Sequence, residues 1–478
     1  MTTKRRTKIV ATLGPATWDD AMLEALLEAG ADVVRINCSH SDHNAIRRQV
    51  ARIRRAAMRA DKRVGILLDL QGPKIRTGPV PDAIDLKVDD HLVIAMDDEL
   101  VGSGLRVGTT YPAMADDVNP GDDVLFDDGA LQGVVEAVHR DRDPKEVVVR
   151  MTVSGPLKSH KGINLPGVDM SVPSMTEKDR GDLAVGADVG VDYVALSFVR
   201  SAKDVEVLRA EMTKLNVDLP VIAKIEKPEA VENIDEILDV VEGIMVARGD
   251  LGVEIRIERV PVVQKELIQS AYKAGKLVIT ATQMLDSMIR NPRPTRAETT
   301  DVANAILDGT DAVMLSGETA TGSYPLESVR MMDSIAREVE QSRFFTTTPI
   351  AEIPAPDGVA SVVIRSACWA ANEDERALVV FTWSGKSALV ASKARPHGPI
   401  YAFAFNGEVL DQLALAWGVT PLELQDLRSV DDLIAAGIKE LKRRKLVVPG
   451  DKLVIIAGSS PVVGATDLMK LEIVGEDA

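Results

Sequence analysis

Residues 220–230 read PVIAKIEKPEA, a short apolar run that ends in charged residues and is followed by a proline. A run of this length and composition is typical of a buried strand. Pro228 stands where the first turn of a helix tolerates proline. The stretch therefore predicts a strand followed by a helix, with Lys224 and Glu226 at the carboxyl end of the strand.

Seven further apolar runs of this kind occur along the chain, and windows with helical periodicity separate most of them. These seven runs lie at 8–14, 32–38, 64–70, 193–199, 242–248, 276–282 and 311–317, and residues 220–226 are the eighth. Eight strands that alternate with helices are the pattern of a closed (β/α)8 barrel. We therefore predict an α/β protein built on a TIM barrel.

Two segments interrupt or follow the barrel pattern. Residues 72–172 contain Asp/Gly/Pro-rich turns and short alternating runs, which predict a small inserted β domain, a β-barrel lid. The stretch FFTTTPIAEIPAPDG at 344–358 is typical of a linker. The expected domains are thus the barrel (1–71 and 173–345), the lid (72–172) and a C-terminal open α/β domain (346–478).

Composition narrows the classes of partner and location. The net charge of −17 argues against broad binding to nucleic acid or an anionic membrane, so a small-molecule partner is expected. The two cysteines, Cys38 and Cys368, match neither a disulfide framework nor a zinc pattern, which fits a reducing cytoplasm. Neither a signal peptide nor a membrane-spanning apolar run is predicted.

Helix-start signals support the predicted barrel units. Thr17 with Asp20, Thr176 with Asp179 and Ser201 with Asp204 each form a Ser/Thr-to-aspartate pair that is typical of a helix N-cap.

Polar residues gather at the carboxyl ends of the predicted strands, where barrel enzymes carry their chemistry. In strand order they are Arg35, Asn37, Ser39, Asp69, Lys224, Glu226, Arg248, Asp250, Thr282, Ser316 and Glu318. This concentration of charge predicts a catalytic site at that end of the barrel.

Two carboxylates among these residues are candidate metal ligands. Lys224 and Glu226 are two residues apart, so they project to the same side of their strand. Asp250 ends the next strand and lies beside Glu226 if the two strands are neighbours. Paired carboxylates suit Mg²⁺ or Mn²⁺. The alternatives are a strand-end ion pair without chemistry and, for Asp250, a helix N-cap.

The motifs KIVATLGPAT, RINCSH, GPKIRTG, KGINLPG, AKIEKPEA, MVARGDLGVE, ITATQMLDSM, PRPTRAETTDVANA and VMLSGETATGSYP occur in this order. In order and spacing, the chain resembles the pyruvate kinase family. The resemblance implies transfer of a phosphoryl group from phosphoenolpyruvate to ADP, giving pyruvate and ATP. It also implies a cytoplasmic homotetramer that uses Mg²⁺, with Mn²⁺ as a possible substitute.

The resemblance assigns roles to the strand-end residues. Lys224 matches the lysine that neutralises the transferring phosphoryl group and the enolate, and Glu226 and Asp250 match the metal ligands. Arg35 matches a phosphate-binding arginine. The backbone of Ala247, Arg248, Gly249 and Asp250 would face the substrate carboxylate. Thr282 lies where enolpyruvate receives its proton, with a water relay through Ser316 and Glu318.

Nucleotide-side positions are matched by Asn37, Cys38, Ser39, His40, Arg76 and Lys161, and the lid would close over ADP. Ser39, Thr282 and His40 could instead make only local bonds to the backbone.

The hinge sequence departs from a common family pattern. Many pyruvate kinases read Asp-Thr-Lys-Gly-Pro-Glu here and require K⁺, held near Asp69, Leu70 and the residues matching Asn37 and Ser39. This chain reads Asp69-Leu70-Gln71-Gly72-Pro73-Lys74. The Lys74 ammonium can supply the charge of the ion, so K⁺ is predicted not to be required. The alternative is a solvated hinge lysine.

The C-terminal domain carries a candidate phosphate loop. Its residues are Thr382, Ser384, Gly385, Lys386 and Ser387. Hydroxyls, helix-start amides and a lysine at a strand-to-helix turn can hold a phosphate, although an ordinary N-cap is the alternative. The resemblance implies an allosteric effector, a sugar phosphate or AMP, with the loop AGSSPVVGATD completing the pocket.

Two other functions fit part of the sequence. An aldolase or carbon–carbon lyase with a metal-bound enolate would use Glu226 and Asp250, but has no obvious use for the lid, Lys224 or Arg76. A metabolite sensor without catalysis would not need the charged strand ends, all of which are present.

Overall fold

Eight parallel strands form a closed barrel in the computed structural model, which describes residues 5–345, 358–373, 376–425, 429–458 and 466–476. Around the barrel the strand order is β1, β16, β15, β14, β13, β12, β3 and β2. Their bounds are β1 Lys8–Thr12, β2 Val33–Asn37, β3 Gly65–Asp69, β12 Tyr193–Leu196, β13 Val221–Ile225, β14 Gly243–Ala247, β15 Leu277–Ala281 and β16 Ala312–Leu315. The predicted (β/α)8 barrel is confirmed, and each strand lies within one of the eight apolar runs.

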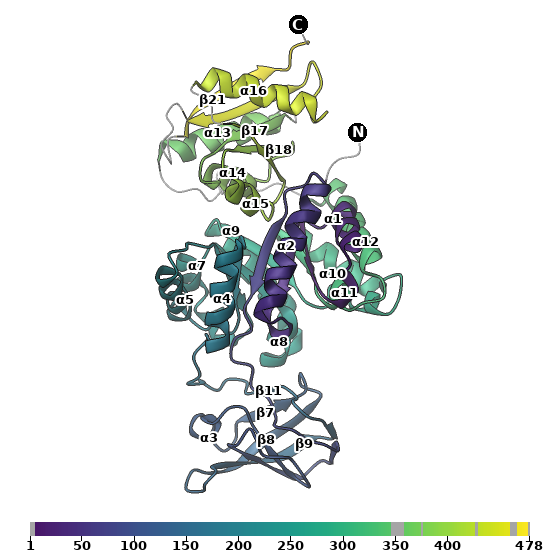
Figure 1. Ribbon diagram of the computed structural model, residues 1–478, viewed down its shortest axis with the longest axis vertical. Helices are drawn as coiled ribbons and strands as arrows, with labels where there is room; N and C mark the ends of the chain where they lie inside the picture. The colour runs from purple at the N-terminus through teal and green to yellow at the C-terminus, as the bar shows by residue number, and fades with distance from the viewer. Residues whose placement is uncertain (1–4, 346–357, 374–375, 426–428, 459–465, 477–478) are drawn as a thin grey trace.

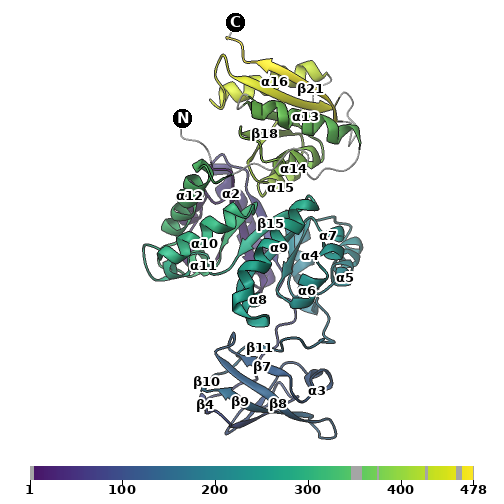
Figure 2. The ribbon, with the colours of Figure 1, turned by 180° about the vertical axis from the view of Figure 1, so that it is seen from behind.

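Helices surround the barrel strands (Figures 1 and 2). They are α1 Asp20–Ala29, α2 His43–Arg59, α4 Glu177–Val189, α5 Ala202–Lys214, α6 Pro228–Glu232, α7 Ile234–Val240, α8 Arg248–Glu254, α9 Val260–Lys273, α10 Arg296–Leu307, α11 Gly317–Ala320 and α12 Pro325–Gln341. Short 3-10 turns occur at Pro15–Thr17, Cys38–His40, Ile257–Arg259 and Asp286–Ile289. Pro228 occupies the first turn of α6, as predicted.

Two of the three predicted helix caps are confirmed and the one at Thr17 is wrong. Ser201 is the N-cap of α5 and forms a capping box with Asp204. Thr176 caps α4 and forms a capping box with Asp179. Asp19, rather than Thr17, caps α1 by accepting a hydrogen bond from the Met22 N–H at 3.0 Å. Thr17 lies in the preceding 3-10 turn, where its hydroxyl accepts a hydrogen bond from the Gly14 N–H. Its hydroxyl is therefore used one turn before the helix begins.

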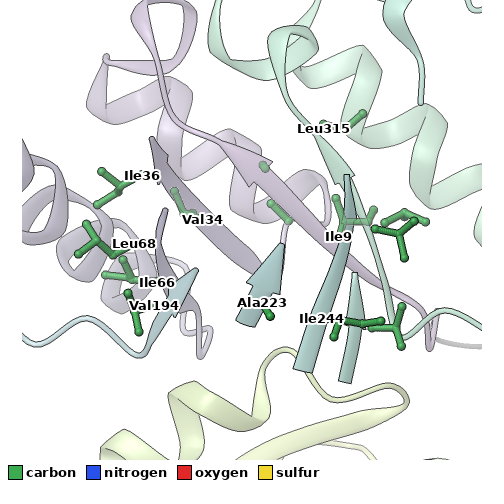
Figure 3. Packing of buried hydrophobic residues seen from close by; sticks show 14 of the residues in the cluster. Ile9, Val34, Ile36, Ile66, Leu68, Val194, Ala223, Ile244 and Leu315 are labelled. Atoms are coloured by element: carbon green, nitrogen blue, oxygen red, sulfur yellow. The ribbon is translucent and has the colours of Figure 1, made fainter. Parts of the chain in front are cut away.

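Successive side chains of each barrel strand point to opposite faces of the sheet, and the two faces form two apolar layers. One buried cluster includes Val33, Leu67 and Ile222, which line the barrel interior together with their counterparts from other strands. A second cluster joins the opposite faces of the strands to the helices. Figure 3 shows this second layer, with Val34, Ile66 and Val194 among its labelled side chains. The interior therefore has no room for substrate, and polar chemistry is confined to the strand ends.

The segment between β3 and α4 is built from short strands. They are β4 Ile84–Leu86, β5 His91–Ala95, β6 Arg106–Gly108, β7 Asp123–Phe126, β8 Leu131–His139, β9 Glu146–Val153, β10 Gly155–Leu157 and β11 Ile163–Asn164, with one short helix, α3 Met114–Asp117. A six-stranded sheet, in the order β11-β7-β8-β9-β5-β6, and the pair β10-β4 enclose a core of their own. The expected boundaries of this inserted domain at residues 72 and 172 stay a prediction.

The C-terminal part is an open sheet with helices. Its strands are β17 Ala377–Phe381, β18 Ile400–Ala404, β19 Val419–Glu423, β20 Lys452–Gly458 and β21 Thr466–Ile473, in the order β19-β18-β17-β20-β21. The helices are α13 Val359–Glu373, α14 Lys386–Lys393, α15 Gly407–Leu413 and α16 Val430–Arg443. Strand β21 is antiparallel to β20, whereas the other pairs are parallel. Most of the predicted linker, and residues 459–465 of the predicted AGSSPVVGATD loop, lie outside the described residues.

The insert and the C-terminal domain lie at opposite ends of the barrel (Figures 1 and 2). Leu415 of the C-terminal domain joins the cluster that fills the barrel interior. The hydroxyl of Tyr193 donates to the Gln412 carbonyl at 2.6 Å. The C-terminal domain therefore covers the amino ends of the strands, while the insert lies beyond their carboxyl ends. Among the described residues, no helix is long and apolar enough to cross a membrane.

Candidate active site

A buried aspartate joins two cations at the carboxyl end of the barrel. Arg35 Nε donates to Asp69 Oδ2 at 2.6 Å, and Lys224 Nζ lies 3.5 Å from Asp69 Oδ1. Arg35, Asp69 and Lys224 each follow an interior apolar residue by two positions, namely Val33, Leu67 and Ile222. The pleat that buries those apolar side chains thus brings the three charges together above them. Burial raises the pKa of Asp69, but the charges of Lys224 and Arg35 outweigh it and hold the pKa below its usual value.

Lys224 is surrounded by negative charge. Its ammonium donates to the Ser197 hydroxyl at 2.7 Å and lies 2.7 Å from Glu226 Oε1. Burial favours the neutral amine, yet the carboxylates of Asp69, Glu226 and Asp250 raise the pKa of Lys224 above its usual value. The lysine is therefore a fixed positive charge at neutral pH, not a base.

Glu226 directly follows β13, and Asp250 lies in the first turn of helix α8, which directly follows β14. β13 pairs with β14, so the two segments that carry the carboxylates are neighbours. Burial, with a smaller contribution from Asp250, raises the pKa of Glu226, while Lys224 and the Phe198 N–H act in the opposite direction. The Phe198 N–H donates to Glu226 Oε2 at 3.0 Å. Ala247, not Asp250, is the N-cap of α8, so the N-cap alternative for Asp250 is wrong.

The two carboxylates fit a hard divalent cation. Glu226 is almost wholly buried and destabilised by the charge of Asp250, a strain that a bound cation relieves. Within the described part of the chain, no cluster of three or more His, Cys, Asp or Glu side chains is placed to hold a metal. Two carboxylates leave the other coordination positions to substrate oxygens and water, as Mg²⁺ or Mn²⁺ prefers.

Thr282 contacts the backbone of the neighbouring loop. Its hydroxyl donates to the Ala281 carbonyl at 2.7 Å and accepts from the Gly249 N–H at 2.6 Å. Thr282 has φ +66°, in the left-handed region that a β-branched residue rarely adopts. The local backbone bonds considered from the sequence are therefore present, and they hold the hydroxyl at the junction of β14 and β15.

The side chain of Arg248 braces the same junction. It donates to the carbonyls of Ala281 at 3.2 Å and Thr282 at 2.9 Å, and its Nη1 lies 2.6 Å from Asp301 Oδ1. The Arg248 side chain is thus occupied by these contacts, and the contact of the backbone of Ala247, Arg248, Gly249 and Asp250 with a substrate carboxylate stays a prediction.

Ser316 and Glu318 follow strand β16. Glu318 accepts from the N–H groups of Ser316 at 2.8 Å and Leu285 at 3.0 Å, and burial raises its pKa. The buried hydroxyl of Ser316 has no hydrogen-bond partner in the described residues. A raised carboxyl pKa beside an unpartnered hydroxyl suits a proton relay with water.

The segment from Asn37 to His40 forms a turn after β2. Asn37 Oδ1 accepts from the Ser39 N–H at 3.1 Å, and Cys38 is buried. Burial, then the charges of Lys74, Arg76 and Arg35, lower the pKa of His40. The electrostatic field of Lys74 thus reaches this turn, although Lys74 itself is exposed.

Two cations predicted to contact the nucleotide, Arg76 and Lys161, belong to the insert. Arg76 Nη1 donates to the His160 carbonyl at 2.8 Å, and Lys161 pairs with Asp127 at 2.8 Å. Asn164 of β11 donates to Glu254 of α8 at 2.9 Å, a contact that joins the insert to the barrel.

The predicted phosphate loop precedes α14. Gly385 is the N-cap with φ +80°, and its N–H donates to the Thr382 hydroxyl at 3.0 Å. Ser387 shares a hydrogen bond with Thr466 at 2.8 Å, whereas Lys386 is exposed. Ser384 is half-buried in the same turn.

Ser197 and Phe198 contact Lys224 and Glu226 and were not predicted as site residues. Both lie inside the run 193–199, and the polar Ser197 at its carboxyl end was the one available signal.

The fold and the site define a (β/α)8-barrel enzyme with a buried cation beside two carboxylates at the carboxyl end of its strands. The pyruvate kinase barrel-domain model matches residues 4–329, and the pyruvate kinase alpha/beta-domain model matches residues 361–472. The chain belongs to the pyruvate kinase family.

Individual relatives agree with this assignment. A pyruvate kinase of Geobacillus stearothermophilus is 46% identical over 99% of this chain and 81% of its own length. A pyruvate kinase of Mycobacterium tuberculosis (strain ATCC 25618 / H37Rv) is 45% identical over 99% of both chains. The crystal structure of a pyruvate kinase from Cryptosporidium parvum has a TM-score of 0.91 and 34% identity, covering 98% of this chain and 96% of that one.

Proposed function

We propose that the enzyme transfers the phosphoryl group of phosphoenolpyruvate to ADP, giving pyruvate and ATP. The observation that carries this proposal is the position of Lys224, a buried ammonium held between Asp69, Glu226 and Asp250. Phosphoryl transfer needs positioning and charge stabilisation more than a nucleophile, and such a cation supplies them.

The residues of the site divide the work. Lys224 stabilises the charge that develops on the transferring group and on the enolate oxygen, and Arg35, oriented by Asp69, binds the phosphate. Glu226 and Asp250 would hold Mg²⁺, which when bound neutralises substrate oxygens. The N–H groups near Gly249 orient the substrate carboxylate. Arg76 and Lys161 approach the nucleotide from the insert, and the turn from Asn37 through Cys38 and Ser39 to His40 contacts it from the barrel.

Proton delivery to the enolate completes the proposed reaction. Thr282 lies at the edge of the site, and Ser316 with Glu318 connects to it through water. The raised pKa of Glu318 keeps a proton available closer to neutral pH than an ordinary glutamate would.

A coupled assay for ATP tests the proposal. Purified enzyme, phosphoenolpyruvate, ADP and Mg²⁺ should yield ATP and pyruvate in equal amounts. Cleavage of a carbon–carbon bond in a 2-oxo acid, without ATP formation, would support the aldolase or lyase alternative instead.

We also propose that the enzyme does not require K⁺. Lys74 lies where its charge lowers the pKa of His40, close to the turn of Asn37 and Ser39. Turnover in tetraalkylammonium buffer should stay near its value with K⁺, and Lys74→Glu should create a K⁺ requirement. Activation of the unmodified enzyme by KCl of tenfold or more would contradict this.

We propose further that the loop 382–387 binds the phosphate of an allosteric effector. The N-terminus of α14, the exposed Lys386 and the hydroxyls of the loop support this. A sugar monophosphate, a sugar bisphosphate and AMP should be compared for a rise in melting temperature that Lys386→Ala abolishes. A homotetramer in the cytoplasm is expected from the family and is testable by light scattering and fractionation.

A further inference from the structure

The loop after strand β12 touches both the catalytic lysine and the point where the chain leaves the barrel for the insert. Ser197 and Phe198 form this loop, directly after β12 ends at Leu196. Leu70 and Gly72 belong to the segment that leaves β3 and enters the insert. The loop and this hinge segment are more than a hundred residues apart in sequence.

The Ser197 hydroxyl bridges the two sites. It donates to the Leu70 carbonyl at 2.8 Å and accepts from Lys224 Nζ at 2.7 Å. Ser197 is 1% exposed, so water does not replace either bond. One buried hydroxyl thus donates a hydrogen bond to the hinge and accepts one from the catalytic ammonium.

Phe198 makes a second connection of the same kind. Its N–H donates to Glu226 Oε2 at 3.0 Å, and its φ of +55° is in the left-handed region, which is unfavourable for an aromatic residue. A Cβ atom on Gly72 would lie 2.7 Å from Cδ2 of the Phe198 ring. The hinge therefore needs glycine there, both for its φ of +68° and for the space that the ring occupies.

We propose that Ser197 is a positioning residue for phosphoryl transfer, which fixes the Lys224 ammonium relative to the lid hinge. This proposal rests on the proposed function. Because the same hydroxyl bonds to Leu70 and to Lys224, a displacement of Leu70 would change the position of the ammonium.

The variant Ser197→Ala tests this role. Loss of a hydrogen bond to a charged group should lower kcat by roughly tenfold or more. KM for ADP should change less than about twofold, because no nucleotide contact is removed. Ser328→Ala is the matched control, since the buried Ser328 hydroxyl also donates to a backbone carbonyl at 2.8 Å, in helix α12. It should leave kcat unchanged.

A double-mutant cycle with Lys224→Met separates positioning from a structural role. If Ser197 acts through the lysine, Ser197→Ala should lower kcat by less than about twofold in the Lys224→Met background. A loss of equal size in both backgrounds, or a kcat for Ser197→Ala within twofold of the unmodified enzyme, would overturn the proposal.

Two further measurements keep the test decisive. If Ser197→Ala does not fold, Ser197→Cys replaces it, because a thiol keeps the shape but is a weaker donor and acceptor, and a loss of roughly threefold is expected. An unmodified enzyme that forms no ATP would refute the proposed function, whereas an active enzyme with an unaffected Ser197 variant would refute this inference alone.

Discussion

The two ends of the barrel each bury an aspartate between a lysine and an arginine. At the carboxyl end, Asp69 contacts Arg35 and Lys224. At the amino end, Asp311 contacts Lys393 at 2.5 Å and Arg395 at 2.8 Å, both from the C-terminal domain. The two aspartates are nearly inaccessible. The same three residue types therefore occur twice, at the insert side and under the C-terminal domain.

The pKa values of the two lysines shift in opposite directions. Burial lowers the pKa of Lys393, and Asp311 only partly compensates. At the other end, three carboxylates outweigh burial and raise the pKa of Lys224. The Asp311 cluster thus has two cations for one carboxylate and is buried, whereas the Asp69 cluster has three carboxylates for two cations. The surplus of carboxylates at the carboxyl end is what the proposed metal site needs, and the Asp311 cluster has no such surplus.

The largest effect on stability is expected at the amino end. Asp311→Asn leaves Lys393 and Arg395 buried without a counter-charge, which should destabilise the protein by about 3–5 kcal/mol. Thermal or denaturant unfolding measures the loss. The exposed pair of Arg59 and Glu24 is the control, because Glu24→Gln should cost at most about 1 kcal/mol. A loss that small for Asp311→Asn would mean that the amino-end cluster is not structural.

The carboxyl end should respond to substitution through metal use. Glu226→Gln removes a charged ligand but keeps an oxygen that can accept from the Phe198 N–H. The Mg²⁺ concentration for half-maximal rate should rise roughly 10²-fold, while the melting temperature changes little. A lower melting temperature of this variant with an unchanged Mg²⁺ requirement would show that Glu226 has a structural role.

The pH dependence of metal binding should follow the raised pKa of Glu226. The ionised carboxylate binds the metal, so affinity is lost as pH falls through that pKa, at a pH above that of an ordinary glutamate. Titration of Mn²⁺ binding by electron paramagnetic resonance measures it. Glu318→Gln should leave this pH limb in place, although the pKa of Glu318 is also raised. If the limb moves in Glu318→Gln, the pH dependence comes from Glu318 and not from Glu226.

The smallest effect is expected at Thr282. Thr282→Ser keeps the hydroxyl and its bonds to Gly249 and Ala281, so kcat should change less than about threefold. Thr282→Ala leaves the Gly249 N–H without this partner and should lower kcat roughly tenfold. Steady-state kinetics compares the two, and equal losses would show that the hydroxyl is not required.

The sequence predicted those features that depend on local periodicity. Eight apolar runs led to the barrel, and the spacing of Lys224 and Glu226 predicted that both project to the same side of their strand, where they form an ion pair. Other features depend on tertiary contacts that no local pattern encodes. The bridge from Ser197 to Leu70 joins distant segments, and the side chain of Arg248 turns to Asp301 although its position in the sequence is that of a site residue.

One helix start and two strands of the C-terminal sheet were also beyond local signals. Thr17 and Asp19 are both good cap residues within three positions, and the backbone of the preceding turn decides between them. Strands β19 and β21 were not predicted. The exposed apolar and charged residues of β21 give it a weak pattern, since one of its faces is not buried.

Substitution of the two lysines tests the comparison most directly. Lys224→Met and Lys393→Met are measured side by side for kcat in the ATP-forming assay and for melting temperature. We expect Lys224→Met to lower kcat by ~10²-fold or more with a small change in melting temperature. Lys393→Met leaves Asp311 paired with Arg395 and lies at the other end of the barrel, so kcat of the folded enzyme should stay within about threefold. Near-normal turnover of folded Lys224→Met would contradict the assignment of the catalytic charge.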